Sequence, residues 1–289
     1  MIKQKSVLNA YIELMKPSIL TLVLVTTTLG FYLGGHGISS WSLLTYLLIG
    51  AACVCGGSGV LNHYLERDID CKMVRTRNRP IPSGIISAAN ALSFGILLTL
   101  IGLTILYIKV NLLTAFLSLL TSFLYIIVYT PMKRISWLNT TIGSIPGAIP
   151  PMGGWAAATG NIDLGAWIIF LILFLWQHPH FYAIAWMFKE DYKLGGFKML
   201  PVVEPDGKST FNQILLYSII LIPVSLLPTL IGLSGYIYFA GALIAGVLLF
   251  IVGRNLTMTK SLIDARKLLK ATVFYLPILL LLIVIDVNF

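Results

Sequence analysis

Long apolar runs dominate this chain, and each is about as long as a helix that crosses a membrane. Hydrophobic residues make up 57% of the sequence, charged residues make up 11%, and the mean hydropathy is +0.90. A helix needs about twenty residues to cross about 30 Å of hydrocarbon, whereas a membrane barrel has short alternating segments. The unbroken runs therefore predict an all-α integral membrane protein.

Nine runs of this kind predict nine transmembrane helices. Their expected limits are 18–36, 42–62, 89–108, 112–130, 138–157, 165–187, 213–233, 236–253 and 271–287. With this topology, nineteen of the twenty lysine and arginine residues lie on the same side as the N-terminus, and only Lys109 lies opposite. Because short basic loops stay on the cytoplasmic side, we expect the N-terminus in the cytoplasm and the C-terminus outside.

The charge balance and the N-terminal sequence limit the expected partners and location. Topology and anionic lipid headgroups account for most of the net charge of +9, so membrane lipid is an expected partner and nucleic acid is not. The first residues, MIKQKSVLNAYIELMKPS, show neither a cleavable signal nor an arginine-rich transit pattern. We expect one transmembrane domain over residues 1–289, in the cytoplasmic membrane of a bacterium.

A charged segment, NHYLERDIDCKMVRTRNRPIPSG at 62–84, follows the second apolar run directly. Asn62, Glu66 and Asp70 have i, i+4 and i+8 spacing, so a continuing helix would present an amide and two carboxylates on one face. Such oxygen ligands suit Mg²⁺, which completes its shell with phosphate and water. The alternative is a solvated helix end in which Glu66 and Asp70 pair with Arg67 and Lys72, and the spacing alone does not decide between the two.

The basic residues that come next favour the metal-binding interpretation. Lys72, Arg75 and Arg77 precede the rigid turn RPIPSG, and Arg79 is its first residue. Guanidinium groups bind phosphate oxygens well. The segment thus combines carboxylates that can bind a metal cation with basic side chains that can bind phosphate. This combination predicts a site for a metal-bridged diphosphate.

A second segment, WQHPHFYAIAWMFKEDYKLGGFKMLPVV at 176–203, places ionisable residues inside an apolar run. His178 and His180 flank Pro179, and ionisable residues at membrane depth usually serve function. The alternative is that neighbouring backbone in a kink satisfies both histidines.

The same segment ends in a second charged cluster. Glu190 and Asp191 lie between Lys189 and Lys193. One helical stripe would connect His178, through Tyr182, to Glu190. We expect the two charged clusters to close over a shared cavity.

These two segments, together with YTPMKRISWLNTTIGSIPGAIPPMGGWAAATG at 129–160, resemble the UbiA-like intramembrane prenyltransferases. The resemblance covers essentially the whole chain and is strongest to the members that use heme as the acceptor. It implies nine helices around a central cavity, with two acidic motifs at the cytoplasmic mouth that bind Mg²⁺ and an isoprenyl diphosphate. The implied metal ligands are Asn62, Glu66, Asp70, Glu190 and Asp191.

The sequence departs from the usual family pattern at both motifs. His63 and Glu66 stand where the first motif usually has aspartate. In the second motif, His178, Tyr182 and Trp186 stand where related quinone prenyltransferases have aspartates. The second departure resembles the heme-specific members.

The resemblance implies transfer of a farnesyl group from farnesyl diphosphate to a vinyl group of heme B, with addition of water, giving heme O and diphosphate. The implied partner downstream is an enzyme that forms heme A or a terminal oxidase assembly. Departure of the diphosphate would then be assisted by the first motif and by the cations Lys72, Arg75, Arg79 and Lys189. His178 or His180 would lie close to heme, and Tyr182 would bind substrate with its ring face near the farnesyl cation. Lys133 and Arg134 would pair with the heme propionates.

Three alternatives remain at the level of sequence. A UbiA-like enzyme could prenylate an aromatic quinone precursor instead of heme. A secondary transporter would also carry intramembrane prolines and buried histidines. A structural assembly factor would function without Asn62 or Asp70.

Overall fold

A computed structural model describes residues 6–288 of the chain, in which helices are joined by turns and loops and the β structure is one isolated bridge between Ser234 and Val287. The elements are α1 (Val7–Leu14), α2 (Pro17–Gly34), α3 (Trp41–Asp70), α4 (Ala88–Lys109), α5 (Leu112–Phe123), the π-helix η1 (Leu124–Tyr129), α6 (Thr130–Ile135), α7 (Asn139–Thr159), α8 (Leu164–Met187), α9 (Lys189–Leu194), α10 (Leu200–Val203), α11 (Lys208–Leu230), α12 (Tyr236–Thr259) and α13 (Leu262–Ile285).

Within residues 6–288, eight helices are long and apolar enough to cross a membrane, and the continuous segment Leu112–Ile135 counts as one of them. The ninth expected span, 138–157, is also helical, as α7, but it is not among these eight. Most of α7 is buried, including Asn139, Thr140 and Ser144. Because a helix in the interior does not face lipid, it needs no uniformly apolar surface.

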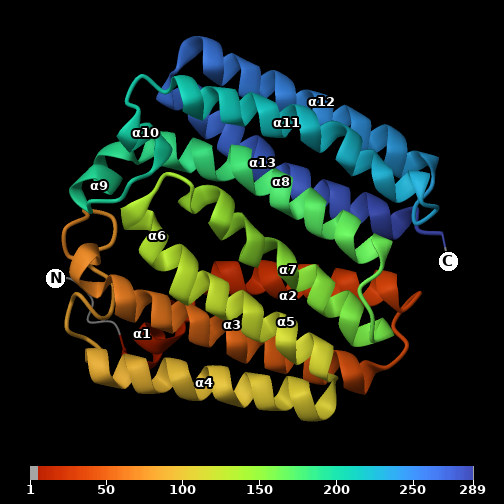
Figure 1. Cartoon of the computed structure of the whole chain (residues 1–289), viewed down its shortest axis with the longest axis horizontal. Coiled ribbons are helices and arrows are strands. Elements are labelled where there is room, and N and C mark those ends of the chain that lie inside the picture. The colour runs from red at the N-terminus through yellow and green to blue at the C-terminus, as the bar shows by residue number, and fades with distance from the viewer. Residues whose placement is uncertain (1–5, 289) are drawn as a thin grey trace.

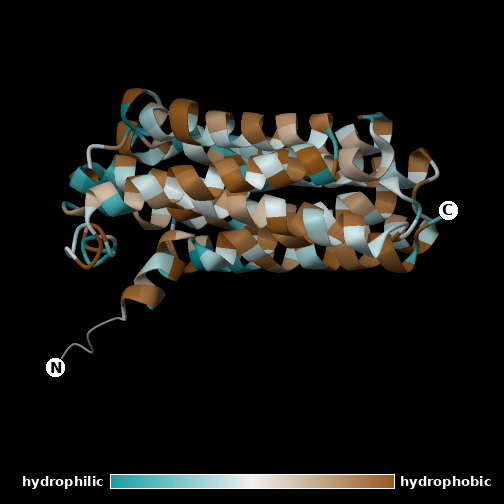
Figure 2. Cartoon of the chain, turned by 90° about the horizontal axis from the view of Figure 1, so that it is seen from below, coloured by the Kyte–Doolittle hydropathy of each residue, from teal (hydrophilic) through white to brown (hydrophobic). Residues whose placement is uncertain are grey.

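The long helices lie side by side in one bundle (Figure 1). Helix α3 packs along α4, α2 along α7, and α11 along α12 and α8. Figure 2 shows hydrophobic residues along the length of the bundle. Large apolar side chains on its outside are exposed, among them Leu97, Phe116, Leu248 and Leu281. An apolar outer surface of this extent suits contact with lipid.

Two glycines allow α2 and α7 to approach with backbone against backbone. A Cβ atom on Gly30 would overlap the carbonyl oxygen of Pro151, and a Cβ atom on Gly154 would overlap that of Thr27. This small-residue contact is typical of membrane helix pairs. It holds α7 in the interior, beside the cavities described below.

The helices α9 and α10 lie at one end of the bundle, called the α9 end here (Figure 1). At this end the loop after α3 packs against the loop after α8 through Ile69, Met73, Ala185, Phe197 and Met199. The carboxylate of Asp191 also accepts hydrogen bonds from the backbone N–H groups of Val74 and Arg75, at 3.2 and 3.3 Å. The segments 62–84 and 176–203 therefore meet at this end of the bundle, whereas the side chains of Glu190 and Asp191 do not line the polar cavity described below.

Candidate active site

The first acidic motif lies on one face of α3, which continues to Asp70. Asn62, Glu66 and Asp70 are 0%, 5% and 0% exposed, and all three line a polar cavity of about 90 Å³ at the α9 end. Asp68 points away from this face, because its side chain is 82% exposed and lies 3.7 Å from Arg67. The motif is therefore helical and buried, and the alternative of a solvated helix end is wrong.

Two cations neutralise the carboxylates of the motif. Lys133 Nζ donates to Glu66 Oε1 at 2.8 Å, and Arg79 Nη1 donates to both oxygens of Asp70 at 2.8 Å. The ion pairs are partly buried, with the Lys133 side chain 12% exposed and that of Arg79 25% exposed. We expected Lys133 at the rim beside a propionate. It lies inside the polar cavity instead, because the short helix α6 packs against α3.

Lys16 is a third cation at this site, whereas its sequence position predicted only one more basic residue on the cytoplasmic side. Its Nζ atom donates to Asn62 Oδ1 and to the Tyr125 hydroxyl, the latter at 3.0 Å. Lys16 lies between α1 and α2 with a φ of 55°. Burial, reinforced by the positive charge of Lys133, lowers the pKa of Lys16 to about 7. The sequence feature that could have indicated this role is the position of the lysine, directly before Pro17 at the start of an apolar run.

A π-helical turn carries two tyrosines beside these cations. The rings of Tyr125 and Tyr129 stack with centroids 5.6 Å apart, and Lys133 Nζ lies 4.6 Å from the Tyr129 centroid. Asn62 Nδ2 donates to the Thr130 hydroxyl at 3.0 Å, and that hydroxyl donates to the Tyr125 carbonyl at 2.8 Å. The π turn, a feature frequent at functional sites, is thereby attached to the acidic motif.

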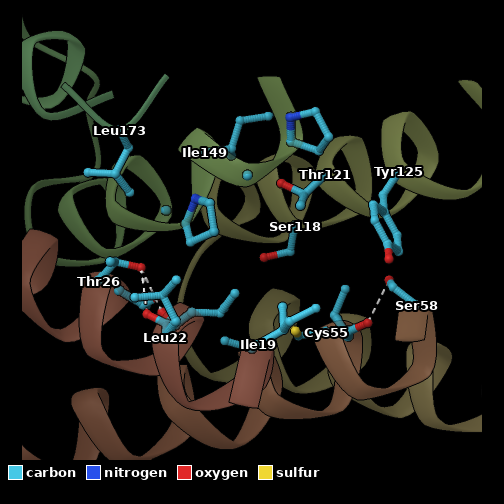
Figure 3. A pocket seen from close by; sticks show the side chains of 18 of the residues that line it. Ile19, Leu22, Thr26, Cys55, Ser58, Ser118, Thr121, Tyr125, Ile149 and Leu173 are labelled. Atoms are coloured by element: carbon cyan, nitrogen blue, oxygen red, sulfur yellow. Dashed lines mark hydrogen bonds between the residues drawn. The ribbon is translucent and has the colours of Figure 1, made fainter. Parts of the chain in front are cut away.

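A larger, mostly apolar cavity of about 330 Å³ adjoins the polar one. Lys16 and Tyr129 line both cavities and so mark the junction between them. Figure 3 shows Ser118, Thr121 and Tyr125 on one side of the larger cavity, facing Ile19 and Cys55. Along α2 the lining runs from Lys16 to Thr27, about 16 Å at the rise of a helix. A charged chamber thus leads into a deep apolar one.

The two histidines lie on different sides of α8, because residues two apart point about 200° from each other on a helix. His180 lines the apolar cavity. His178 lines neither cavity, and its ring stacks on Tyr217 with centroids 3.5 Å apart. His178 Nδ1 lies 2.8 Å from the Phe174 carbonyl, so backbone does satisfy that nitrogen. Tyr182 is buried near His178 and also lies outside the lining of both cavities.

The second acidic cluster, Glu190 and Asp191, does not line the polar cavity that contains the first motif. Helix α8 ends at Met187 and α9 begins at Lys189, so the expected stripe from His178 to Glu190 is broken. Glu190 is exposed, and neither it nor Asp191 lines the polar cavity. The Asp191 carboxylate is occupied by the backbone of the loop after α3.

The remaining expected residues are divided between the cavity and the surface. Arg75 lines the polar cavity, and its guanidinium lies 5.0 Å from the Phe188 ring centroid. Lys72 and Arg134 are exposed and outside the cavity lining. Lys189 Nζ lies 4.4 Å from the Trp186 ring centroid, away from both cavities.

The first motif offers a donor set that suits a magnesium ion shared with a substrate. Between residues 6 and 288, no three His, Cys, Asp or Glu side chains are grouped to hold a metal on their own. Asn62, Glu66 and Asp70 instead supply one amide and two carboxylate groups to a single polar cavity. Mg²⁺ commonly takes one or two protein carboxylates and completes its shell with phosphate oxygens and water. The residues present therefore fit Mg²⁺ together with a diphosphate.

A polar chamber with acidic and basic groups, joined to an apolar chamber inside a membrane bundle, defines an intramembrane enzyme for amphipathic substrates. Residues 23–278 match the UbiA prenyltransferase family, and the chain belongs to this family. It is a multi-pass membrane protein.

Relatives named protoheme IX farnesyltransferase match the chain along nearly its whole length. The one from Solibacter usitatus is 46% identical over 287 residues, which covers 96% of this chain and 98% of the relative. The one from Salinibacter ruber is 41% identical and covers 96% of this chain and 98% of the relative.

Solved structures share the fold at low sequence identity. A structure described for digeranylgeranylglyceryl phosphate synthase has a TM-score of 0.81 at 19% identity, covering 97% of this chain and 98% of that one. A UbiA homolog from Archaeoglobus fulgidus bound to GPP and Mg²⁺ has a TM-score of 0.73 at 15% identity, covering 95% and 99%.

Proposed function

We propose that this protein transfers the farnesyl group of farnesyl diphosphate to a vinyl group of heme B, with addition of water, to give heme O and diphosphate. The observation that carries the proposal is the junction at Lys16 and Tyr129, where a chamber suited to a metal-bound diphosphate opens into an apolar chamber. Relatives that are 46% and 41% identical bear the name protoheme IX farnesyltransferase, which supports heme as the acceptor.

The polar chamber binds the diphosphate. Asn62, Glu66 and Asp70 would hold Mg²⁺, and when bound the ion would neutralise charge on the departing diphosphate. Lys16, Arg79 and Lys133 surround the same chamber. Their charges attract the diphosphate and stabilise the negative charge that develops as the allylic C–O bond breaks. The Archaeoglobus homolog bound to GPP and Mg²⁺ supports this assignment.

The apolar chamber binds the farnesyl chain and keeps bulk water from its reactive end. Its depth of about 16 Å along α2 suits a chain of three isoprene units. Tyr125, Tyr129 and Trp176 line it, and aromatic ring faces attract a developing carbocation within about 6 Å. His180 lines the same chamber and is our candidate for contact with the acceptor.

We assign smaller roles to the expected residues outside the chambers. Asp191 holds the loop that carries Arg75 by binding its backbone N–H groups. Arg134 is exposed at the α9 end and stays our candidate partner for a heme propionate. Direct magnesium binding by Glu190 receives no support from its exposed position outside the polar cavity.

We place the protein in the cytoplasmic membrane of a bacterium, with the α9 end in the cytoplasm and α7 as a ninth crossing. Under this topology the charged loops and the polar chamber face the cytoplasm, as the basic residues favour. The whole chain then acts as one domain, and heme O passes to an enzyme or assembly that uses it.

Release of inorganic diphosphate tests the choice of acceptor. Purified protein with Mg²⁺ and farnesyl diphosphate should release diphosphate rapidly when heme B is added and only slowly with an aromatic quinone precursor. Faster release with the quinone precursor would favour the other class of UbiA-like enzyme. Binding of farnesyl diphosphate with no release in any mixture would favour transport.

Binding of farnesyl diphosphate should weaken as the pH rises above about 7. Burial lowers the pKa of Lys16 to about 7, so Lys16 is a cation below that pH and a neutral amine above it. Binding a diphosphate favours the cation, and the dissociation constant should therefore rise by up to about tenfold per pH unit above about 7. Calorimetric titration at several pH values measures this slope.

The Lys16→Met variant should bind farnesyl diphosphate more weakly, and its dissociation constant should lose the dependence on pH. Lys208 is an exposed lysine outside both cavities, so the Lys208→Met variant should keep that dependence. An unchanged slope in Lys16→Met would show that another group titrates.

A further inference from the structure

The tautomer of His180 is set by a residue on a different helix. His180 Nδ1 lies 2.9 Å from the hydroxyl oxygen of Thr272, which is on α13 and 0% exposed. That hydroxyl donates its single hydrogen to the Leu269 carbonyl at 2.7 Å. With that hydrogen on the Leu269 carbonyl, the hydroxyl accepts from His180, and we infer that Nδ1 carries the proton and Nε2 keeps a free lone pair.

Thr272 also fixes the plane of the imidazole. Its backbone carbonyl accepts a hydrogen bond from Trp176 Nε1 at 2.8 Å. The Trp176 ring stacks on the His180 ring with centroids 5.2 Å apart and planes 25° apart. Trp176 and His180 both line the apolar cavity, and Thr272 does not. One residue outside the cavity thus anchors two rings that line it.

The depth of His180 matches the junction of the two cavities. On the same helix, α8, Gln177 donates to the Ser144 carbonyl of α7 at 3.1 Å and lies against Gly147. Helices α7 and α8 are consecutive and antiparallel, so a step of about one turn along α8, from Gln177 to His180, corresponds to a step of about one turn back along α7. His180 therefore lies level with Gly143. A Cβ atom on Gly143 would meet the Tyr129 ring at 2.5 Å. Tyr129 marks the junction, where the first carbon of the prenyl chain would lie.

We propose that His180 Nε2 is the base of the hydration step and that Thr272 is its positioning residue. This inference rests on the proposed function. The terminal vinyl carbon bonds to C1 of the farnesyl group while the C1–O bond breaks and its electron pair leaves with the diphosphate. The vinyl carbon beside the porphyrin is then cationic. Water oxygen bonds to it, and one water proton moves to His180 Nε2, which later releases the proton to solvent.

Replacing Thr272 tests whether this residue positions the His180 ring or only fills space beside it. Thr272→Val keeps the shape but removes the hydroxyl, so Nδ1 loses its acceptor and the tautomer is no longer fixed. We expect kcat for heme O formation to fall by about 10- to 100-fold, since general base catalysis contributes about 10²- to 10⁴-fold. The KM values for farnesyl diphosphate and heme B should stay within about twofold, because neither chamber changes shape.

Two further variants serve as rescue and control. Thr272→Ser restores the hydroxyl and should recover kcat to within about threefold of the unsubstituted protein. Thr99→Val removes a comparable hydroxyl, which donates to the Gly95 carbonyl at 2.8 Å on α4 and does not line either cavity. It should leave kcat unchanged. Equal losses in Thr272→Val and Thr272→Ser would assign Thr272 a packing role and overturn the proposal.

Absorption spectra test the competing role for the same nitrogen. A free Nε2 lone pair also suits a bond to heme iron. The Soret band of bound ferric heme B should be the same in the unsubstituted protein and in His180→Gln, while kcat in His180→Gln falls by about 10²-fold or more. A shifted Soret band would identify His180 as an iron ligand and overturn the proposal.

Heme O formation by the unsubstituted protein distinguishes a failure of this inference from a failure of the proposed function. If it forms heme O and Thr272→Val does so at the same rate, the inference alone is wrong. If it forms no heme O, the proposed function fails and the inference fails with it.

Discussion

Asp70→Asn should lower the rate of farnesyl transfer by about 10³-fold or more. Asp70 is fully buried in the polar cavity, and both its oxygens accept from Arg79. The substitution removes one of the two carboxylates proposed to hold Mg²⁺. It also frees Arg79, whose charge then lacks its counterion. Initial rates of heme O formation at saturating heme B and farnesyl diphosphate measure the loss.

A neighbour on the same helix is the matched control for Asp70→Asn. Asp68 is 82% exposed and does not line the polar cavity, so Asp68→Asn should keep the full rate. Size-exclusion profiles of both variants report folding independently of activity. A folded Asp70→Asn protein with an unchanged rate would remove the acidic motif from the mechanism, as the structural assembly factor interpretation requires.

Gly154→Ala should destabilise the bundle by about 3 kcal/mol or more, because the new Cβ atom would overlap the backbone carbonyl of Thr27. No rotation of a side chain relieves that overlap, so α2 and α7 must separate. The unfolding midpoint in detergent should fall by roughly 10 °C.

Gly153→Ala tests whether any added methyl on α7 has this effect. A Cβ atom on Gly153 would meet nothing within 4 Å, and alanine favours the helix over glycine by about 1 kcal/mol. The midpoint should therefore stay the same or rise. Equal losses in Gly153→Ala and Gly154→Ala would contradict the close approach of α2 and α7.

Features of the fold that depend on local pattern were predictable from the sequence. Apolar length located the helices, and i, i+4 spacing placed Asn62, Glu66 and Asp70 on one face of α3, where all three are buried. Such patterns are properties of one continuous helix and require no knowledge of its neighbours.

Features that depend on tertiary contacts were not predictable. Lys133 pairs with Glu66 across 67 positions of sequence, and Lys16 reaches Tyr125 across 109. The stripe toward Glu190 was wrong because α8 stops at Met187, a break that the apolar pattern does not mark. Thr272 gave no signal at all, since its role comes from packing of α13 against α8.

The most direct test of the account is the mass of the heme recovered after purified protein is incubated with heme B, farnesyl diphosphate and Mg²⁺. We expect conversion of heme B to a product heavier by one farnesyl group and one hydroxyl group, formed only when all three are present. Recovery of unchanged heme B from folded protein that binds farnesyl diphosphate would contradict it.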